Sequence, residues 1–93
     1  MREYNSILIK EYGYTPYEAE LTTEDIQEMD EESKNALDMF LSGQDITTYG
    51  YGEYTVETLM CNYSMNEIAA LISISELKRD YKGFSDMLRM GTK

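Results

Sequence analysis

The segment LTTEDIQEMDEESKNALDMFLSG, residues 21–43, decides the fold class. Its apolar and small residues recur every three or four positions, the spacing of one face of an α-helix. Thr22 is suited to begin this helix as its N-cap, and Gly43 stands where a helix would end. Asp30 could act as a second N-cap, but the stripe crosses it without a gap, so we predict one helix over 21–43. The stripe comprises Ile26, Met29, Ser33, Ala36, Leu37, Phe40 and Leu41.

Helical patterns also dominate the N-terminal side of this segment. The spacing of the apolar residues predicts a first helix over about 2–12, although the run 6–9 would also suit a short strand. Thr15, Pro16 and Glu18 have the sequence of a capped helix start and predict a short helical turn.

The C-terminal side continues the helical pattern. Thr55 is expected to begin a short helix, and Ser64 with Glu67 forms a capping box that would open the next one. Apolar residues then recur at alternating spacings of four and three, a heptad-like seam that could also support a homodimer, and Gly83 would bend or divide this helix. The seam comprises Ala70, Ile74, Leu77, Tyr81, Phe84 and Leu88.

These patterns predict an all-α fold, a small bundle of about four to five helices in a single domain over 1–93. A chain of 93 residues with 42 % hydrophobic and 28 % charged residues can form one modest core. The lone Cys61 allows no internal disulfide and is expected at the core or its boundary. No apolar run approaches the roughly 20 residues that span a bilayer, and the start of the chain lacks an apolar signal segment. We therefore expect a cytoplasmic protein with no membrane partner.

The net charge of −10 arises almost entirely in the first part of the chain. Residues 1–57 hold 14 acids and 3 bases, whereas residues 58–93 hold 4 acids and 5 bases. Such a charge repels nucleic acid at long range and attracts basic surfaces. On the predicted helix, five acids would face solvent with about 5 to 6 Å along the axis between successive charges, and no lysine relieves the repulsion within the pairs Glu24/Glu28 and Glu28/Glu32. The five acids are Glu24, Asp25, Glu28, Glu31 and Glu32.

Three interpretations of this acidic face are possible. It could be an ordinary solvated helix face, with acids favoured near the positive N-terminal end of the helix dipole. It could also be a surface shaped to meet a basic cleft, which would explain why the repulsion continues through Glu32. A cation site is the third, but no calcium-loop pattern is present.

Nine tyrosines accompany this charge, six of them in two clusters. The skeleton Tyr-Gly-Tyr-x-x-Tyr-x-x-Glu occurs at 12–20 and again at 49–57, but the match ends where the helices begin, so it marks no structural repeat. Tyrosine is enriched in recognition surfaces. We expect the glycine-flanked tyrosines to be the most exposed, and we add five tyrosines to the candidate partner-binding residues: Tyr14, Tyr17, Tyr49, Tyr51 and Tyr54.

The segment YSMNEIAALISIS, residues 63–75, resembles the helix-turn-helix of sigma-like and repressor proteins. Glu67, Ile68, Ala69, Ile74 and Ser75 match that pattern, whereas Ser73 replaces its usual glycine and Arg79 stands where an inward apolar residue is needed. The resemblance implies a base-reading role for residues such as Lys78, but the net charge opposes the phosphate attraction that DNA binding requires. A DNA-binding regulator of a mobile element is thus one alternative, and a non-catalytic helical adaptor another.

No catalytic set is recognisable, since the chain has no histidine, no base beside Cys61 and no glycine-rich phosphate loop. We expect no enzyme activity, cofactor or metal. A short acidic chain rich in tyrosine resembles in type the small inhibitors of phages and mobile elements, among them anti-CRISPR and anti-restriction proteins that imitate nucleic acid. The resemblance implies that the five acids stand in for phosphates, that the partner is a basic nucleic-acid-binding protein such as a CRISPR nuclease, and that the protein acts in the host cytoplasm.

Overall fold

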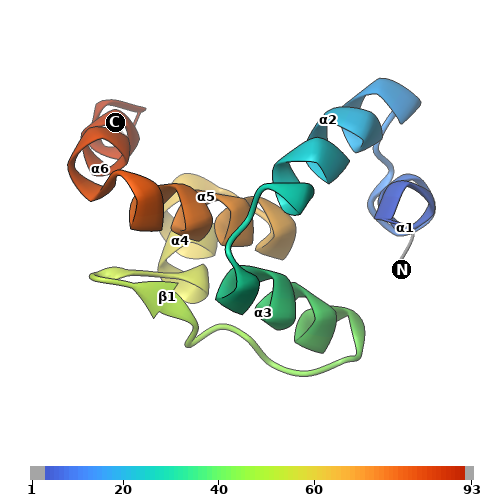
Figure 1. The fold of residues 1–93 in the computed structure, drawn as a ribbon, viewed down its shortest axis with the longest axis horizontal. Coiled ribbons are helices and arrows are strands. Elements are labelled where there is room, and N and C mark those ends of the chain that lie inside the picture. The colour runs from blue at the N-terminus through green and yellow to red at the C-terminus, as the bar shows by residue number, and fades with distance from the viewer. Residues whose placement is uncertain (1–3, 92–93) are drawn as a thin grey trace.

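The computed structural model describes residues 4–91, which form six α-helices and one two-stranded hairpin (Figure 1). The elements are α1 (Tyr4–Tyr12), α2 (Pro16–Gln27), α3 (Glu31–Leu41), β1 (Gly50–Tyr51), β2 (Tyr54–Thr55), α4 (Val56–Tyr63), α5 (Glu67–Arg79) and α6 (Tyr81–Gly91). The all-α prediction is confirmed, with one or two more helices than expected. The radius of gyration of 12.8 Å is close to the value of about 12 Å expected for one globule of this length.

Helix α5 forms the centre of the core. It contacts α3, α4, α6 and the hairpin, while α1 packs on α2 (Figure 1). More than half of its residues are buried because neighbours cover it on most sides: Ile68, Ala70, Leu71, Ser73, Ile74, Ser75 and Leu77. Four of the six residues of the heptad-like seam, Ala70, Ile74, Leu77 and Leu88, are thus buried within the chain, so the seam does not provide a dimer surface.

The single helix predicted over 21–43 is wrong, because the chain forms α2 and α3 with a break at residues 28–30. Asp30 has extended backbone angles and caps α3: its carboxylate accepts hydrogen bonds from the Ser33 backbone N–H at 3.2 Å and from the Ser33 hydroxyl at 2.7 Å. The capped start expected at Thr15 opens α2 itself, which runs straight through Thr22. Ile26 before the break and Met29 within it are both buried, which is why the stripe concealed the break.

Two further helix boundaries differ from the prediction. Ser64 adopts a left-handed conformation (φ 57°) and ends α4, and Asn66 caps α5 through a 2.8 Å hydrogen bond from the Ala69 N–H. The seam breaks at Asp80 rather than at Gly83, since the Asp80 carboxylate accepts a hydrogen bond from the Gly83 N–H at the start of α6.

The stretch 50–55 forms a hairpin that the all-α reading missed. Gly50 pairs with Thr55 and Tyr51 with Tyr54 across a two-residue turn. Gly52 has a φ of 62° at the first turn position, the pattern of a type II′ turn. At Gly50 a Cβ would collide with the backbone of Tyr54 and Thr55. These two glycines are therefore fixed by the hairpin geometry.

Candidate functional site

The acidic surface consists of Glu24, Asp25, Glu28, Glu31 and Glu32, and all five are exposed. Helix α2 packs through a narrow strip, with only Ala19 and Ile26 buried. Residues 17, 21, 24 and 28 follow helical spacing and share the opposite side. On that side Tyr17 is 71 % exposed and Leu21 45 % exposed. The outer face of α2 thus presents an aromatic ring and a leucine beside carboxylates.

The sequence predicted that the acids form one line along a single helix. In the structure they do not. Glu24 and Asp25 lie in the last turn of α2, Glu28 is its C-cap, and Glu31 and Glu32 open α3 after the break. The last two lie at the positive N-terminal end of a helix dipole, where carboxylates are stabilised. The acidic surface is therefore a bent junction between two helices, which is a different shape from the straight row of phosphate positions that was expected.

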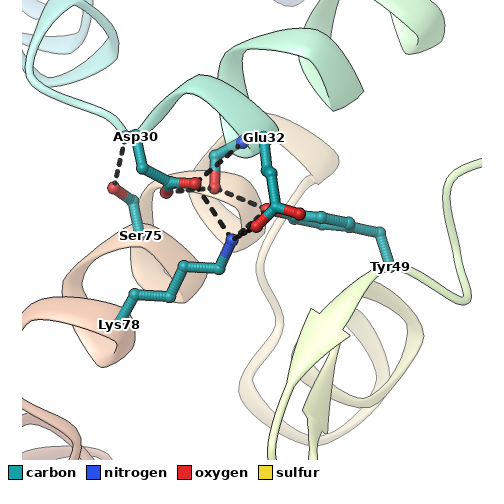
Figure 2. Close-up of polar contacts among 6 residues, drawn as sticks. Asp30, Glu32, Tyr49, Ser75 and Lys78 are labelled. Carbon is teal, nitrogen blue, oxygen red and sulfur yellow. Dashed lines mark hydrogen bonds and ion pairs between the residues drawn. The ribbon is translucent and has the colours of Figure 1, made fainter.

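A polar cluster joins this junction to the core (Figure 2). The Lys78 Nζ of α5 lies 2.9 Å from Asp30 Oδ2, 2.8 Å from Glu32 Oε1 and 2.9 Å from the Tyr49 hydroxyl. Because Tyr49 accepts a hydrogen bond from Lys78, its own proton can be donated to the Ser33 hydroxyl at 2.9 Å. We call Asp30, Glu32, Ser33, Tyr49, Ser75 and Lys78 the Lys78 cluster, Ser75 being included because it accepts a hydrogen bond from the Asp30 N–H at 3.1 Å.

The cluster shifts the protonation of its charged members. Partial burial acts to raise the pKa of Asp30, but hydrogen bonds from Ser33 and Lys78 outweigh it and lower that pKa to about 2. Burial acts to lower the pKa of Lys78, but hydrogen bonds to Glu32, Tyr49 and Asp30 outweigh it and raise that pKa. Both groups therefore stay charged at neutral pH, and the cluster acts as a structural clamp between α3 and α5.

Arg79, the next residue of α5, reaches the end of α2. Its Nη1 lies 2.8 Å from Glu76 Oε1 and 3.9 Å from Glu28 Oε1, and its Nη2 donates to the Glu28 backbone carbonyl. A cation at this helix C-terminus is favourable. The expectation that no base relieves the acidic face is thus wrong for Glu28 and Glu32. Among residues 4–91, Glu24, Asp25 and Glu31 form no ion pair.

Three of the five candidate tyrosines are held inside the fold. Tyr49 is half-buried in the Lys78 cluster, so the prediction that it is among the most exposed is wrong. The same prediction is wrong for Tyr14, which is half-buried and whose hydroxyl accepts a hydrogen bond from the Asn66 side chain at 2.9 Å. Tyr54 is 4 % exposed and its ring packs against Tyr63 and Tyr81.

The two exposed candidate tyrosines lie apart. Tyr17 is on α2 with the acids, whereas Tyr51 lies on the hairpin and is 43 % exposed. The Tyr51 ring packs edge-on against Tyr81, with 5.8 Å between the ring centroids. Figure 1 shows α2 and the hairpin on opposite sides of α5. Of the predicted aromatic set, Tyr17 alone therefore combines exposure with a place on the acidic helix.

The helix-turn-helix pattern at 63–75 is not formed. Helix α5 runs without a break through Ser73, where that pattern requires its turn, and most of its residues are buried. Lys78 and Arg79, which would read bases, are bound to acids of the same chain. Helix α5 is therefore a largely buried core helix and not the second helix of that motif.

Other chemistry finds little support in the part of the chain that the structure describes. No group of three or more metal-ligating side chains occurs within residues 4–91. Cys61 is exposed rather than at the core boundary as expected. Within the same residues, no helix has the length and apolar character to cross a membrane.

Comparison with known proteins gave no match to a family model, a curated protein or a solved structure. The residues that sequence reasoning missed are the internal partners of the acids, chiefly Lys78, Arg79 and Ser75. Their signal was weak: two adjacent bases in a mostly neutral C-terminal part, with an acidic segment about 50 residues earlier.

Proposed function

We propose that the protein is a non-catalytic inhibitor that binds a basic nucleic-acid-binding protein, such as a CRISPR nuclease, and competes with its nucleic acid. The observation that carries this proposal is the outer face of α2, where exposed acids adjoin an exposed tyrosine and leucine. Large aromatic and apolar side chains left in water beside charge are typical of recognition surfaces.

The charge that remains after internal pairing supports the same proposal. Lys78 and Arg79 compensate Glu32 and part of Glu28, but Glu24, Asp25 and Glu31 have no ion-pair partner among residues 4–91. Exposed like charges one helical turn apart destabilise a helix by about 0.2 to 0.5 kcal/mol per pair. A basic partner would relieve this repulsion and be steered towards it.

The proposed imitation of nucleic acid by these acids is partial. Glu24 and Glu28 lie one turn apart, about 6 Å along the helix axis, whereas duplex DNA carries one charge per about 1.7 Å. The bend between α2 and α3 further departs from a straight row. Competition for a basic groove requires only that the acids occupy part of it, and Tyr17 and Leu21 would add contacts that phosphate cannot make.

The proposal is tested with DNA-cleavage assays on a panel of RNA-guided nucleases and restriction enzymes. We expect at least one enzyme to be inhibited at near-stoichiometric concentrations, with inhibition that weakens as ionic strength rises. Lysine at positions 24 and 28 (Glu24→Lys with Glu28→Lys) should abolish it. Glu53→Lys, a charge reversal at an exposed position in the hairpin turn, is the control and should retain most of it. Inhibition that is insensitive to the α2 change would refute the proposed surface.

A further inference from the structure

Two neighbouring clefts lie beside Arg79 and share Glu76, Arg79 and Phe84 in their walls. One, of about 250 Å³, extends to Asp25 and Glu28 of α2. The other, of about 300 Å³, extends to Met87 of α6. We call them together the α2–α6 groove. Both volumes are at or below the lower end of small-molecule pockets, about 300 Å³, so the groove suits side chains of a bound protein segment better than a cofactor.

Apolar side chains form part of the lining of the groove, which we call its floor. Met29 and Phe84 contribute to the first cleft and Phe84 and Met87 to the second. Met87 is 56 % exposed, although it lies beside Phe84 on the apolar side of α6. Methionine side chains are flexible and adapt to different partners. The α6 end of the groove therefore offers apolar surface that nothing in the described chain covers.

The rim of the groove is acidic. Asp25, Glu28, Glu76 and Asp80 line the two clefts, against a single base, Arg79. Within this rim the Arg79 guanidinium lies between Glu76 and Glu28 and is about half exposed. Arg79 thus already occupies the space between Glu76 and Glu28, and Asp25, which forms no ion pair within residues 4–91, is left to pair with a partner.

We propose that the α2–α6 groove binds an arginine-bearing apolar segment of the protein partner. An arginine would extend its aliphatic stem over Met29 and Phe84 and pair with Asp25 or Glu28, and a neighbouring apolar side chain would cover Met87. This inference rests on the proposed function, since it specifies how the basic partner is recognised, and it adds an apolar requirement that charge alone does not impose.

Charge complementarity selects this occupant. A nucleic acid would bring phosphates to the acidic rim, and a second copy of a chain with a net charge of −10 would bring acids to acids. A basic segment without apolar residues would satisfy the rim but leave Met87 in water. An arginine-bearing apolar segment matches both the rim and the floor.

The test uses the full chain labelled with ¹³C-methyl methionine and a ten-residue peptide of alternating arginine and leucine. We expect saturable shifts of the Met29 and Met87 methyl signals, with Met39, exposed on α3 outside the groove, unchanged. A peptide of alternating arginine and glycine, with equal charge, should bind about tenfold more weakly because it leaves the floor uncovered. Met87→Ser should weaken binding of the arginine–leucine peptide by about fivefold or more. Met39→Ser should leave its binding unchanged.

Two results would contradict the proposed peptide binding in the groove without contradicting the proposal that the protein is an inhibitor. One is equal affinity for the two peptides, which would mean that charge alone binds. The other is equal shifts at Met39 and Met87, which would mean non-specific association. Conversely, groove binding by the arginine–leucine peptide without inhibition of any enzyme in the panel would refute the proposed function separately.

Discussion

Helices α2 and α5 have similar lengths, 12 and 13 residues, and neither shows a strong apolar stripe. The reasons are opposite. Helix α5 lacks a stripe because neighbours cover it on most sides, and it buries seven residues. Helix α2 lacks one because most of it faces water, and it buries two. A weak amphipathic pattern can therefore mark either the centre of a fold or its most exposed helix.

Under the proposed function, this contrast separates the helix that stabilises the fold from the helix that binds the partner. The α5 helix carries the core and, through Lys78, the clamp onto α3. The α2 helix is attached by Ala19 and Ile26 and by Arg79 at its end, so its outer face can vary at little cost to folding. Substitutions in α5 should therefore lower the stability of the protein, and substitutions in α2 should weaken the proposed binding.

The largest effect is expected for Leu71→Ala in α5. Leu71 is completely buried, and truncating a buried leucine typically lowers the free energy of unfolding by about 2 to 5 kcal/mol. The matched control is Leu21→Ala in α2, where the leucine is 45 % exposed and the expected change is within about 0.5 kcal/mol. Urea unfolding followed by circular dichroism measures both. Similar losses for the two variants would contradict the contrast between the helices.

A smaller loss is expected for Lys78→Met, which removes the cation of the Lys78 cluster. The partly buried Asp30 would lose its charged partner and Tyr49 its hydrogen-bond donor, which should cost about 1 to 3 kcal/mol. Lys82→Met, an exposed position on α6, is the control and should change stability by less than about 0.5 kcal/mol. If both lysines prove equally dispensable, Lys78 does not clamp α3 to α5, and apolar packing with the hydrogen bond from Asp30 to Ser75 is enough to hold α3.

The same cluster predicts a pH dependence. The pKa of Asp30 is about 2 in the folded protein and 3.8 as the ordinary value. The unfolded chain therefore binds the proton first as pH falls, so this stabilisation is complete above about pH 4 to 5 and is lost towards pH 2. Allowing for solvent screening at a partly exposed group, it amounts to about 1 to 2 kcal/mol. In unfolding measurements from pH 2 to 6, Asp30→Asn should remove this portion of the pH dependence and keep the cap; identical profiles would exclude it.

The sequence predicted much of the fold because its helix signals are local. The capped start at Thr15 and Pro16 and the helix begun by Thr55 are present as expected. The break at Asp30 was missed because a buried stripe and a cap compete there. One of the hydrogen bonds at the break, from the Asp30 N–H to the Ser75 hydroxyl, joins residues 45 positions apart. The chain order alone does not show that contact.

The two tyrosine and glycine stretches show the same limit for the candidate site. Both have the skeleton Tyr-Gly-Tyr-x-x-Tyr-x-x-Glu, yet the first leads into α2 with Tyr17 exposed and the second folds into a hairpin with Tyr54 buried. Equivalent residues differ because Tyr54 packs on Tyr63 and Tyr81, while nothing in the described chain covers Tyr17. Exposure is a tertiary property, and glycine flanks do not predict it.

The smallest effect on stability is expected for the acids of α2, where we expect the largest effect on binding. Glu24→Lys with Asp25→Lys reverses two charges in the last turn of α2 that have no ion-pair partner among residues 4–91, at a helix end where the dipole favours cations. Relief of repulsion at about 0.2 to 0.5 kcal/mol per pair should leave stability unchanged or raise it slightly, and any gain should vanish at high salt. Thermal unfolding at low and high ionic strength measures this. A loss above about 1 kcal/mol would mean that these acids support the fold. A role in binding would then not be needed to explain why they face water with no ion-pair partner in the described part of the chain.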